Sequence, residues 1–326
     1  MKSLPKSLPN AVVFVLFIIV IVILSSAPTT LAQCEKEIFS NGCHDKRESM
    51  KLKVIAFVAI LVSSVIGVSL PLFSRYMPSL APDRNLFTVV KAFSSGVILA
   101  TGYMHVLPDS FNDLMSDCLP RNPWKKFPFT TFVAMLSALF TLMVDSFAMS
   151  LYKKRSGPAN NGATQEDGNR TIENLEHGHG HALDLNYTSS QLLRHRVIAQ
   201  VLELGIVVHS VVIGLAMGAS DNRCTIRSLI AALCFHQMFE GMGLGGCILQ
   251  AEYKFRMKAI MVFFFSVTTP LGIVLGVGLT KVYSQTSPTA LIVVGLLNAS
   301  SAGLLNYMAL VDLLAADFLG PKLQKI

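Results

Sequence analysis

Residues 197–219 read VIAQVLELGIVVHSVVIGLAMGA, an apolar stretch in which Glu203 is the only charged residue and His209 lies near the middle. A bilayer core about 30 Å thick takes roughly 20 residues of α-helix, so this stretch has the length of a membrane span. Its apolar residues also run on without the alternation that a barrel strand needs. The stretch therefore predicts a transmembrane helix.

Six further runs of the same length and character occur along the chain, at 53–74, 86–108, 127–151, 227–250, 258–280 and 288–311. The chain of 326 residues is 52% hydrophobic and only 14% charged, whereas a soluble domain has about 25% charged residues. The sequence therefore predicts an all-α, polytopic transmembrane helix bundle with seven visible spans. The net charge of +7 does not indicate nucleic-acid binding, because the basic residues are scattered among short loops. The predicted surrounding is the lipid bilayer.

Residues 1–32 have the layout of a secretory signal peptide. Lys2 and Lys6 precede an apolar run at 11–24, and small residues follow up to Ala32. The run is shorter than a full span, which favours cleavage; an uncleaved anchor is the alternative. Cleavage would place the mature N-terminus outside the cytosol and route the chain through the secretory pathway to the plasma membrane.

Residues 33–51 then form an extracellular tail. Its two cysteines, Cys34 and Cys43, would meet an oxidising compartment and are candidates for a disulfide. Cys118 and Cys224 fall in loops that we expect on the same outer side.

This orientation divides the rest of the chain into spans one to three at 52–152, a cytosolic loop at 153–196, spans four to seven at 197–320 and a tail at 321–326. The loops predicted to be cytosolic hold more Lys and Arg than the outer loops, in agreement with the positive-inside rule.

The loop at 153–196 is polar and rich in Gly, Asn, Asp and Glu, which predicts disorder. It contains His177, His179 and His181, three imidazoles that could hold Zn²⁺ loosely; a plain polar spacer is the alternative. Glycosylation sequons at Asn169 and Asn186 would require the lumenal side. They conflict with the cytosolic position, which the basic residues after span three favour.

Polar residues in the middle of spans four and five are candidates for function, because a polar side chain in hydrocarbon is costly. His236 and Glu240 are four residues apart and so share one helical face, and His209 lies at matching depth in the preceding span. Neutral imidazole and carboxylate bind Zn²⁺ and Fe²⁺, so these three predict one metal site, with Ser210 and Gln237 as weaker ligands beside it. An interhelical hydrogen bond is the alternative for any one of these histidines taken alone.

Two further patterns concern access to this site and the packing around it. His105, Asp109 and Asp113 recur every four residues at the outer end of span two, and they either gather cations at an outer mouth or form a solvated helix end. After Glu240, the spacing of Gly241 and Gly245 predicts close packing of span five against another helix.

The predicted chemistry is transport. Mixed nitrogen and oxygen ligands allow a metal to be released again, so Zn²⁺ or Fe²⁺ is expected as transported substrate, with no tightly bound cofactor. An intramembrane metalloprotease would need His-Glu-x-x-His, which the chain lacks, and no enzyme is predicted. A metal-binding membrane protein that does not transport stays open, as does a homodimer.

Three motifs resemble those of the ZIP (Zrt/Irt-like) family of metal-ion importers, in its plant iron-regulated branch. They are Gly102-Tyr-Met-His105-Val-Leu-Pro-Asp109, His209-Ser210-Val-Val-Ile-Gly214 and His236-Gln237-Met-Phe-Glu240-Gly241. The resemblance implies eight helices, a variable His-rich loop after the third, and a transport site between the fourth and fifth. It also implies uptake of zinc or iron(II) into the cytosol, with an iron-selective importer that also carries manganese and cadmium as the alternative.

The chain departs from the family pattern at two places. Many members have a binuclear centre with a carboxylate in span four, where this chain has Ile213. We therefore expect one strong metal position with a weaker neighbour. Relatives continue into an eighth span after the segment at 317–320, so the eighth helix is expected to be missing here.

Overall fold

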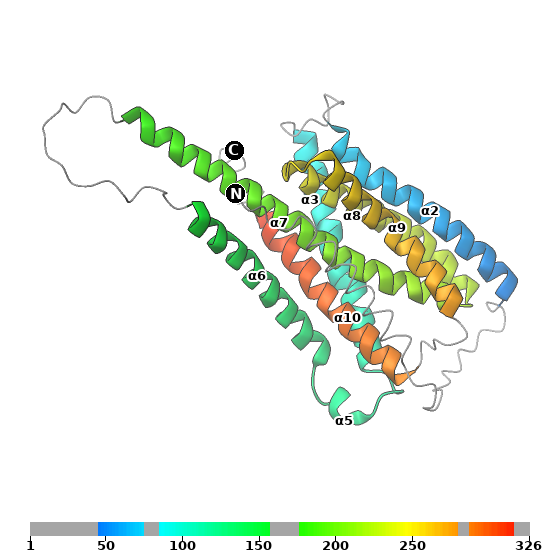
Figure 1. The fold of residues 1–326 in the computed structure, drawn as a ribbon. Coiled ribbons are helices and arrows are strands. Elements are labelled where there is room, and N and C mark those ends of the chain that lie inside the picture. Colours follow the sequence, from blue (N-terminus) through cyan, green and yellow to red (C-terminus); the bar gives the residue numbers. More distant parts are fainter. Residues whose placement is uncertain (1–44, 75–84, 157–175, 280–286, 316–326) are drawn as a thin grey trace, which may run out of the picture.

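The structure is a computed structural model that describes residues 45–74, 85–156, 176–279 and 287–315 (Figure 1). The helical elements are α2 (Lys46–Leu72), α3 (Asn85–Thr101), η3 (Gly102–Val106), α4 (Leu107–Leu114), α5 (Arg121–Trp124), α6 (Phe129–Ser156), α7 (Glu176–Ala219), α8 (Arg223–Gln250), α9 (Phe255–Leu279), α10 (Pro288–Tyr307) and η4 (Met308–Ala315). The segments η3 and η4 are π-helical and continue their neighbours, so α3–η3–α4 and α10–η4 are each one long rod. The predictions for 1–32, for Cys34 and Cys43, and for 321–326 lie outside the described residues.

Six helical segments of the described chain are long and apolar enough to cross a membrane. They are Lys46–Leu72, Leu86–Leu114, Phe129–Phe147, Gln191–Ala219, Phe255–Leu279 and Pro288–Ala315. These confirm six of the seven predicted spans as apolar helices. The seventh, at 227–250, is confirmed as the helix α8, but His236, Gln237 and Glu240 in its middle make it too polar to join the other six.

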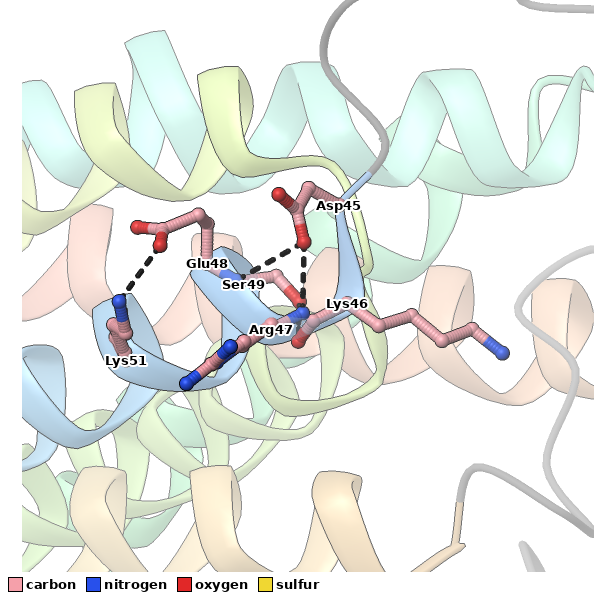
Figure 2. Close-up of polar contacts among 6 residues, drawn as sticks. All are labelled: Asp45, Lys46, Arg47, Glu48, Ser49 and Lys51. Carbon is pink, nitrogen blue, oxygen red and sulfur yellow. Dashed lines mark hydrogen bonds and ion pairs between the residues drawn. The ribbon is translucent and has the colours of Figure 1, made fainter.

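The N-terminus of α2 is capped by polar side chains (Figure 2). The Asp45 carboxylate accepts hydrogen bonds from the backbone N–H groups of Arg47, at 2.9 Å, and Glu48, at 3.3 Å. Such an N-cap satisfies donors that have no partner within the helix. Lys51 adds an ion pair with Glu48 at 2.7 Å.

The prediction of a disordered loop at 153–196 is wrong for residues 176–196, which are helical. Instead, α6 continues to Ser156 and α7 begins at Glu176, so its first turns project beyond the bundle (Figure 1). Between Ala182 and Arg196 the sequence has neither Pro nor Gly, and an existing helix extends at little cost per added residue. His177, His179 and His181 lie in this first part of α7.

Four helices, α2, α7, α8 and α9, form what we call the first bundle. In it α2 packs along α8, and α7 packs along α9. The contact between α2 and α8 confirms the predicted close packing of span five, because a Cβ added at Gly241 would lie 2.8 Å from the Val68 backbone nitrogen. Across α7 and α9, a Cβ added at Gly218 would lie 2.2 Å from the carbonyl oxygen of Ile273. The backbones touch in both pairs, as is common for helices in membranes.

The rods α3–η3–α4 and α10–η4, together with α6, form the second bundle. There α10 packs against α6 on one side and against α4 and η3 on the other. The two bundles meet mainly where α3 contacts α8 and where α10 and α6 contact α7. Helices adjacent in the sequence are thus often separated in space.

The two ends of the protein differ in packing. We call the end where α4 stops at Leu114 and α7 at Ala219 the outer end, and the end where α8 stops at Gln250 the inner end. The largest cluster of buried apolar residues lies towards the inner end and draws on both bundles. Its members include Ile198 and Leu202 of α7 and Leu305 of α10. The core therefore seals the bundles together on the inner side.

Candidate metal-transport site

Three histidines from three different rods lie together in the middle of the protein. The ring centroids of His209 on α7 and His236 on α8 are 6.1 Å apart. The ring of His105, on η3, lies 5.7 Å from that of His209 and 6.0 Å from that of His236. We call these residues the histidine triad.

The triad spans the boundary between the bundles, because His105 belongs to the second bundle and the other two to the first. Sequence reasoning placed His105 at the outer mouth with Asp109 and Asp113, whereas the structure brings it beside the predicted ligands. It still reaches towards the mouth, since its Nδ1 lies 3.5 Å from Asp109 Oδ2. His105 thus connects the mouth to the site.

The π-helical segment η3 explains why His105 points this way. A π-helical turn holds an extra residue and so rotates the following side chains relative to a regular α-helix. At the start of η3, Gly102 leaves space for a neighbour: a Cβ there would lie 2.1 Å from Asn306 Oδ1. A larger residue would therefore displace the Asn306 side chain.

The polar atoms at the site are buried and lack protein hydrogen-bond partners. His209 is 3% exposed and Glu240 is fully buried. Both ring nitrogens of His209, both carboxylate oxygens of Glu240, and the Nε2 atoms of His105 and His236 have no hydrogen-bond partner. Buried polar atoms without partners cost about 1–3 kcal/mol each. So many in one place indicate a site made for a ligand.

The donor set suits a divalent transition metal. With a Zn–N bond near 2.0 Å, the ring centroid of a bound imidazole lies about 3 Å from the ion. The centroids of the histidine triad surround a point about 3.4 Å from each. Within the described residues, no three His, Cys, Asp or Glu side chains are already close enough to hold one ion. Binding therefore requires the rings to turn and move inward slightly.

Ser210 and Gln237, the two residues predicted as weaker ligands, are both buried. Ser210 is 1% exposed and Gln237 is 2% exposed, and neither Ser210 Oγ nor Gln237 Nε2 has a hydrogen-bond partner. Ile213 occupies the position where many relatives are expected to have a carboxylate, and its side chain is buried beside the site. The second position therefore offers only neutral oxygen and nitrogen atoms besides Glu240.

A cavity of about 190 Å³ connects this site to the outer end. His209 lines its inner part, and Asp109 and Asp113 line it from α4. Asn298 of α10 faces the same space. The predicted acidic strip thus borders the passage that leads to His209.

The cysteines are consistent with an oxidising compartment at this end. Cys118, after α4, and Cys224, at the start of α8, are both disulfide-bonded. Cys234 and Cys247 lie within α8 and form no disulfide. Disulfides persist in the secretory pathway and outside the cell, so the outer end is the one expected to face away from the cytosol.

The profile of the family described as ZIP Zinc transporter matches residues 50–326. The chain belongs to this family. Zinc transporter 7 of Arabidopsis thaliana is 59% identical to it over 305 residues, which cover 90% of this chain and 84% of that protein. Fe(2+) transport protein 2 of Oryza sativa subsp. japonica is 62% identical over 299 residues, or 86% and 81% of the two chains. Fe(2+) transport protein 1 of Arabidopsis thaliana is 55% identical over 328 aligned positions, or 99% and 92%.

No solved structure gives a significant match to the chain. The ZIP family membership and the six apolar helices together make this a multi-pass membrane protein. All three histidines of the triad lie within the matched residues.

Proposed function

We propose that this protein carries Zn²⁺ or Fe²⁺ across the plasma membrane into the cytosol. The observation that supports this most is the histidine triad with Glu240, a set of buried metal-binding atoms without protein partners at the inner end of an outer cavity. Relatives named for zinc transport and for Fe(2+) transport support the two candidate ions equally. A transporter is also favoured over an enzyme, because the relatives are named as transporters.

The outer part of the path begins at the acidic cavity. Asp109 and Asp113 attract the hydrated cation and replace part of its water, and His105 next to Asp109 passes it inward. His209, His236 and Glu240 then bind it with neutral nitrogen and anionic oxygen, ligands that exchange readily. His177, His179 and His181 accept the ion loosely after release.

Release requires that the set of ligands be broken. His105 is on the second bundle and the remaining ligands are on the first, so a displacement of one bundle against the other removes one ligand from the ion. Rocking of one bundle against another is the common way in which transporters alternate access. The glycine contacts inside the first bundle allow it to move as a unit.

Uptake of radioactive zinc and iron(II) by cells that express the chain tests the proposal. We expect uptake above that of cells with the empty vector, with each ion competing against the other and against manganese and cadmium. A protein that reaches the plasma membrane and binds zinc but gives no uptake above the vector would contradict transport. It would favour a metal-binding membrane protein that does not transport.

The acidic cavity gives a second test. Asp113→Asn is expected to raise the KM for metal about 3- to 10-fold with little change in the maximal rate, because it weakens the local attraction for cations. The matched control is Asp117→Asn: Asp117 is exposed, pairs with Lys125 and does not line the cavity. Equal KM values for the two variants would contradict a role of Asp113 in collecting metal.

A further inference from the structure

A partly buried ion pair joins the two bundles at the inner end. Arg194 Nη2 of α7 lies 3.3 Å from Asp312 Oδ1 of η4. The Asp312 side chain is 1% exposed, and that of Arg194 is 33% exposed. We call this contact the inner ion pair. It differs from the pair between Lys53 and Asp221, at 3.6 Å, which lies within the first bundle.

The surroundings of the inner ion pair carry more negative than positive charge. Asp145 of α6 and Tyr307 of α10 are close enough to interact electrostatically with Arg194. Asp145 Oδ1 and Tyr307 Oη are buried and have no hydrogen-bond partner. One guanidinium of the first bundle thus faces two carboxylates of the second. Removing it would leave Asp312 as a buried charge without its partner, which is costly.

The inner ion pair lies on the opposite side of the histidine triad from the outer cavity. Along α7, Leu202 lies between Arg194 and His209, and along the second bundle Leu305 and Ala309 precede Asp312. These three apolar residues are fully buried and belong to the same cluster. The inner end is therefore closed twice, by an apolar layer and by an ion pair.

The π-helical segments add a second connection between the bundles. Each carries the polar residue that contacts the first bundle: η3 carries His105, which contacts the rings of His209 and His236, and η4 carries Asp312, which contacts Arg194. π-Helical turns often occur at functional sites, where they redirect a side chain. A π-helical segment thus supplies a contact between the bundles both at the metal site and at the inner end.

We propose that Arg194 and Asp312 form the inner gate of the transport path, and that their ion pair must open for metal to leave. The proposal rests on the proposed function, because it assigns the pair to the release step of transport. While the pair is closed, the first bundle is held against η4 and the apolar layer stays dry. Once the pair opens, the bundles can separate at the inner end, and the site can empty in that direction.

Accessibility of a buried residue tests the gate without requiring transport. Ala309→Cys places a thiol in the apolar layer, one helical turn before Asp312. Inside-out membrane vesicles containing the full chain are treated with a membrane-impermeant maleimide. The same protein with Ala309 intact measures labelling of the native cysteines. Combining the reporter with Asp312→Asn is expected to speed its labelling about tenfold, the size of a typical coupling between conformational states.

Two further variants distinguish opening of a specific gate from a general loss of packing between the helices. The exchange Arg194→Asp with Asp312→Arg restores opposite charges and is expected to return labelling towards the original rate. Arg196→Gln is the matched control, since Arg196 Nε donates to the Ala251 carbonyl oxygen within the first bundle, at 3.0 Å. That variant is expected to leave the labelling of the reporter unchanged. If Asp312→Asn does not fold, Arg194→Gln at the more exposed end of the pair carries the same test.

Labelling that stays slow in Asp312→Asn or Arg194→Gln would overturn the gate, as would faster labelling that Arg196→Gln reproduces equally. The result is independent of the uptake experiment. If the original protein carries no metal, the proposed function fails while the labelling still decides whether the pair closes the inner end. If it carries metal and labelling does not change, only the gate fails.

Discussion

Alanine in place of His105 is expected to abolish most metal uptake and to lower the maximal rate as well as the affinity. The ring of His105 lies 5.7 Å and 6.0 Å from the rings of His209 and His236, so its loss removes one corner of the triad. A residue that acted only at the outer mouth would instead raise the KM and leave the maximal rate nearly unchanged. The two roles are therefore separated by steady-state uptake over a range of zinc concentrations.

Metal binding provides a readout apart from transport. A ligand that binds only the folded state stabilises it by about 2.7 kcal/mol at 100 times its Kd. Zinc is therefore expected to raise the Tm of the purified original protein, and to raise that of His105→Ala much less at the same concentration. The double replacement of His209 and His236 by alanine is expected to remove both the stabilisation and the uptake.

The control for these variants is His195→Ala. His195 lies on α7 like His209 but is outside the histidine triad, so its replacement is expected to leave zinc stabilisation intact. A His105→Ala variant with an unchanged maximal rate and full zinc stabilisation would contradict the assignment of His105 as a ligand. That result would support a role of His105 at the outer mouth instead.

The parts of the site that could be predicted depend on helical periodicity and on the short connection between two spans. His236 and Glu240 share a face because they are four residues apart on one helix, and His209 could be added because the connection between the two spans is short. Composition and run length were likewise sufficient for the all-α class. None of these inferences requires knowledge of which distant helices touch.

The sequence grouped His105 with Asp109 and Asp113 and did not predict its proximity to His209 and His236, for a physical reason. Its spacing from Asp109 and Asp113 follows regular α-helical periodicity, which predicts one common face. The π-helical segment η3 (Gly102–Val106) contains His105, and no residue in the sequence states where such a turn will form. The contact with His209 and His236 also depends on how α3–η3–α4 crosses the first bundle, which is tertiary information.

The length of α7 shows a second limit of prediction from the sequence. Composition predicted disorder up to residue 196, yet the helix begins at Glu176. Composition reports how much apolar area a segment can bury alone, and it does not include the helix to which the segment is attached. In contrast, the glycine spacing in α8 did predict close packing, although the partner, α2, is far away in the sequence.

That glycine packing leads to the second large effect, on folding. Gly245→Ala is expected to destabilise the protein by about 1–3 kcal/mol, as overpacking commonly does. A Cβ at this position would lie 2.5 Å from the Val68 carbonyl oxygen and 3.2 Å from Pro71 Cγ. The backbone of α2 is the obstacle, so only a separation of the two helices can make space. Because α8 also carries His236 and Glu240, uptake is expected to fall together with stability.

The next residue provides the control, since a Cβ at Gly246 would meet nothing within 4 Å. Alanine is favoured over glycine in a helix by up to about 1 kcal/mol, so Gly246→Ala is expected to be neutral or stabilising. Thermal unfolding of the two purified variants in detergent, followed by loss of soluble monodisperse protein, measures the difference. Opposite effects at adjacent positions of one helix would identify the α2–α8 contact as the cause, whereas equal effects would show that this contact does not limit stability.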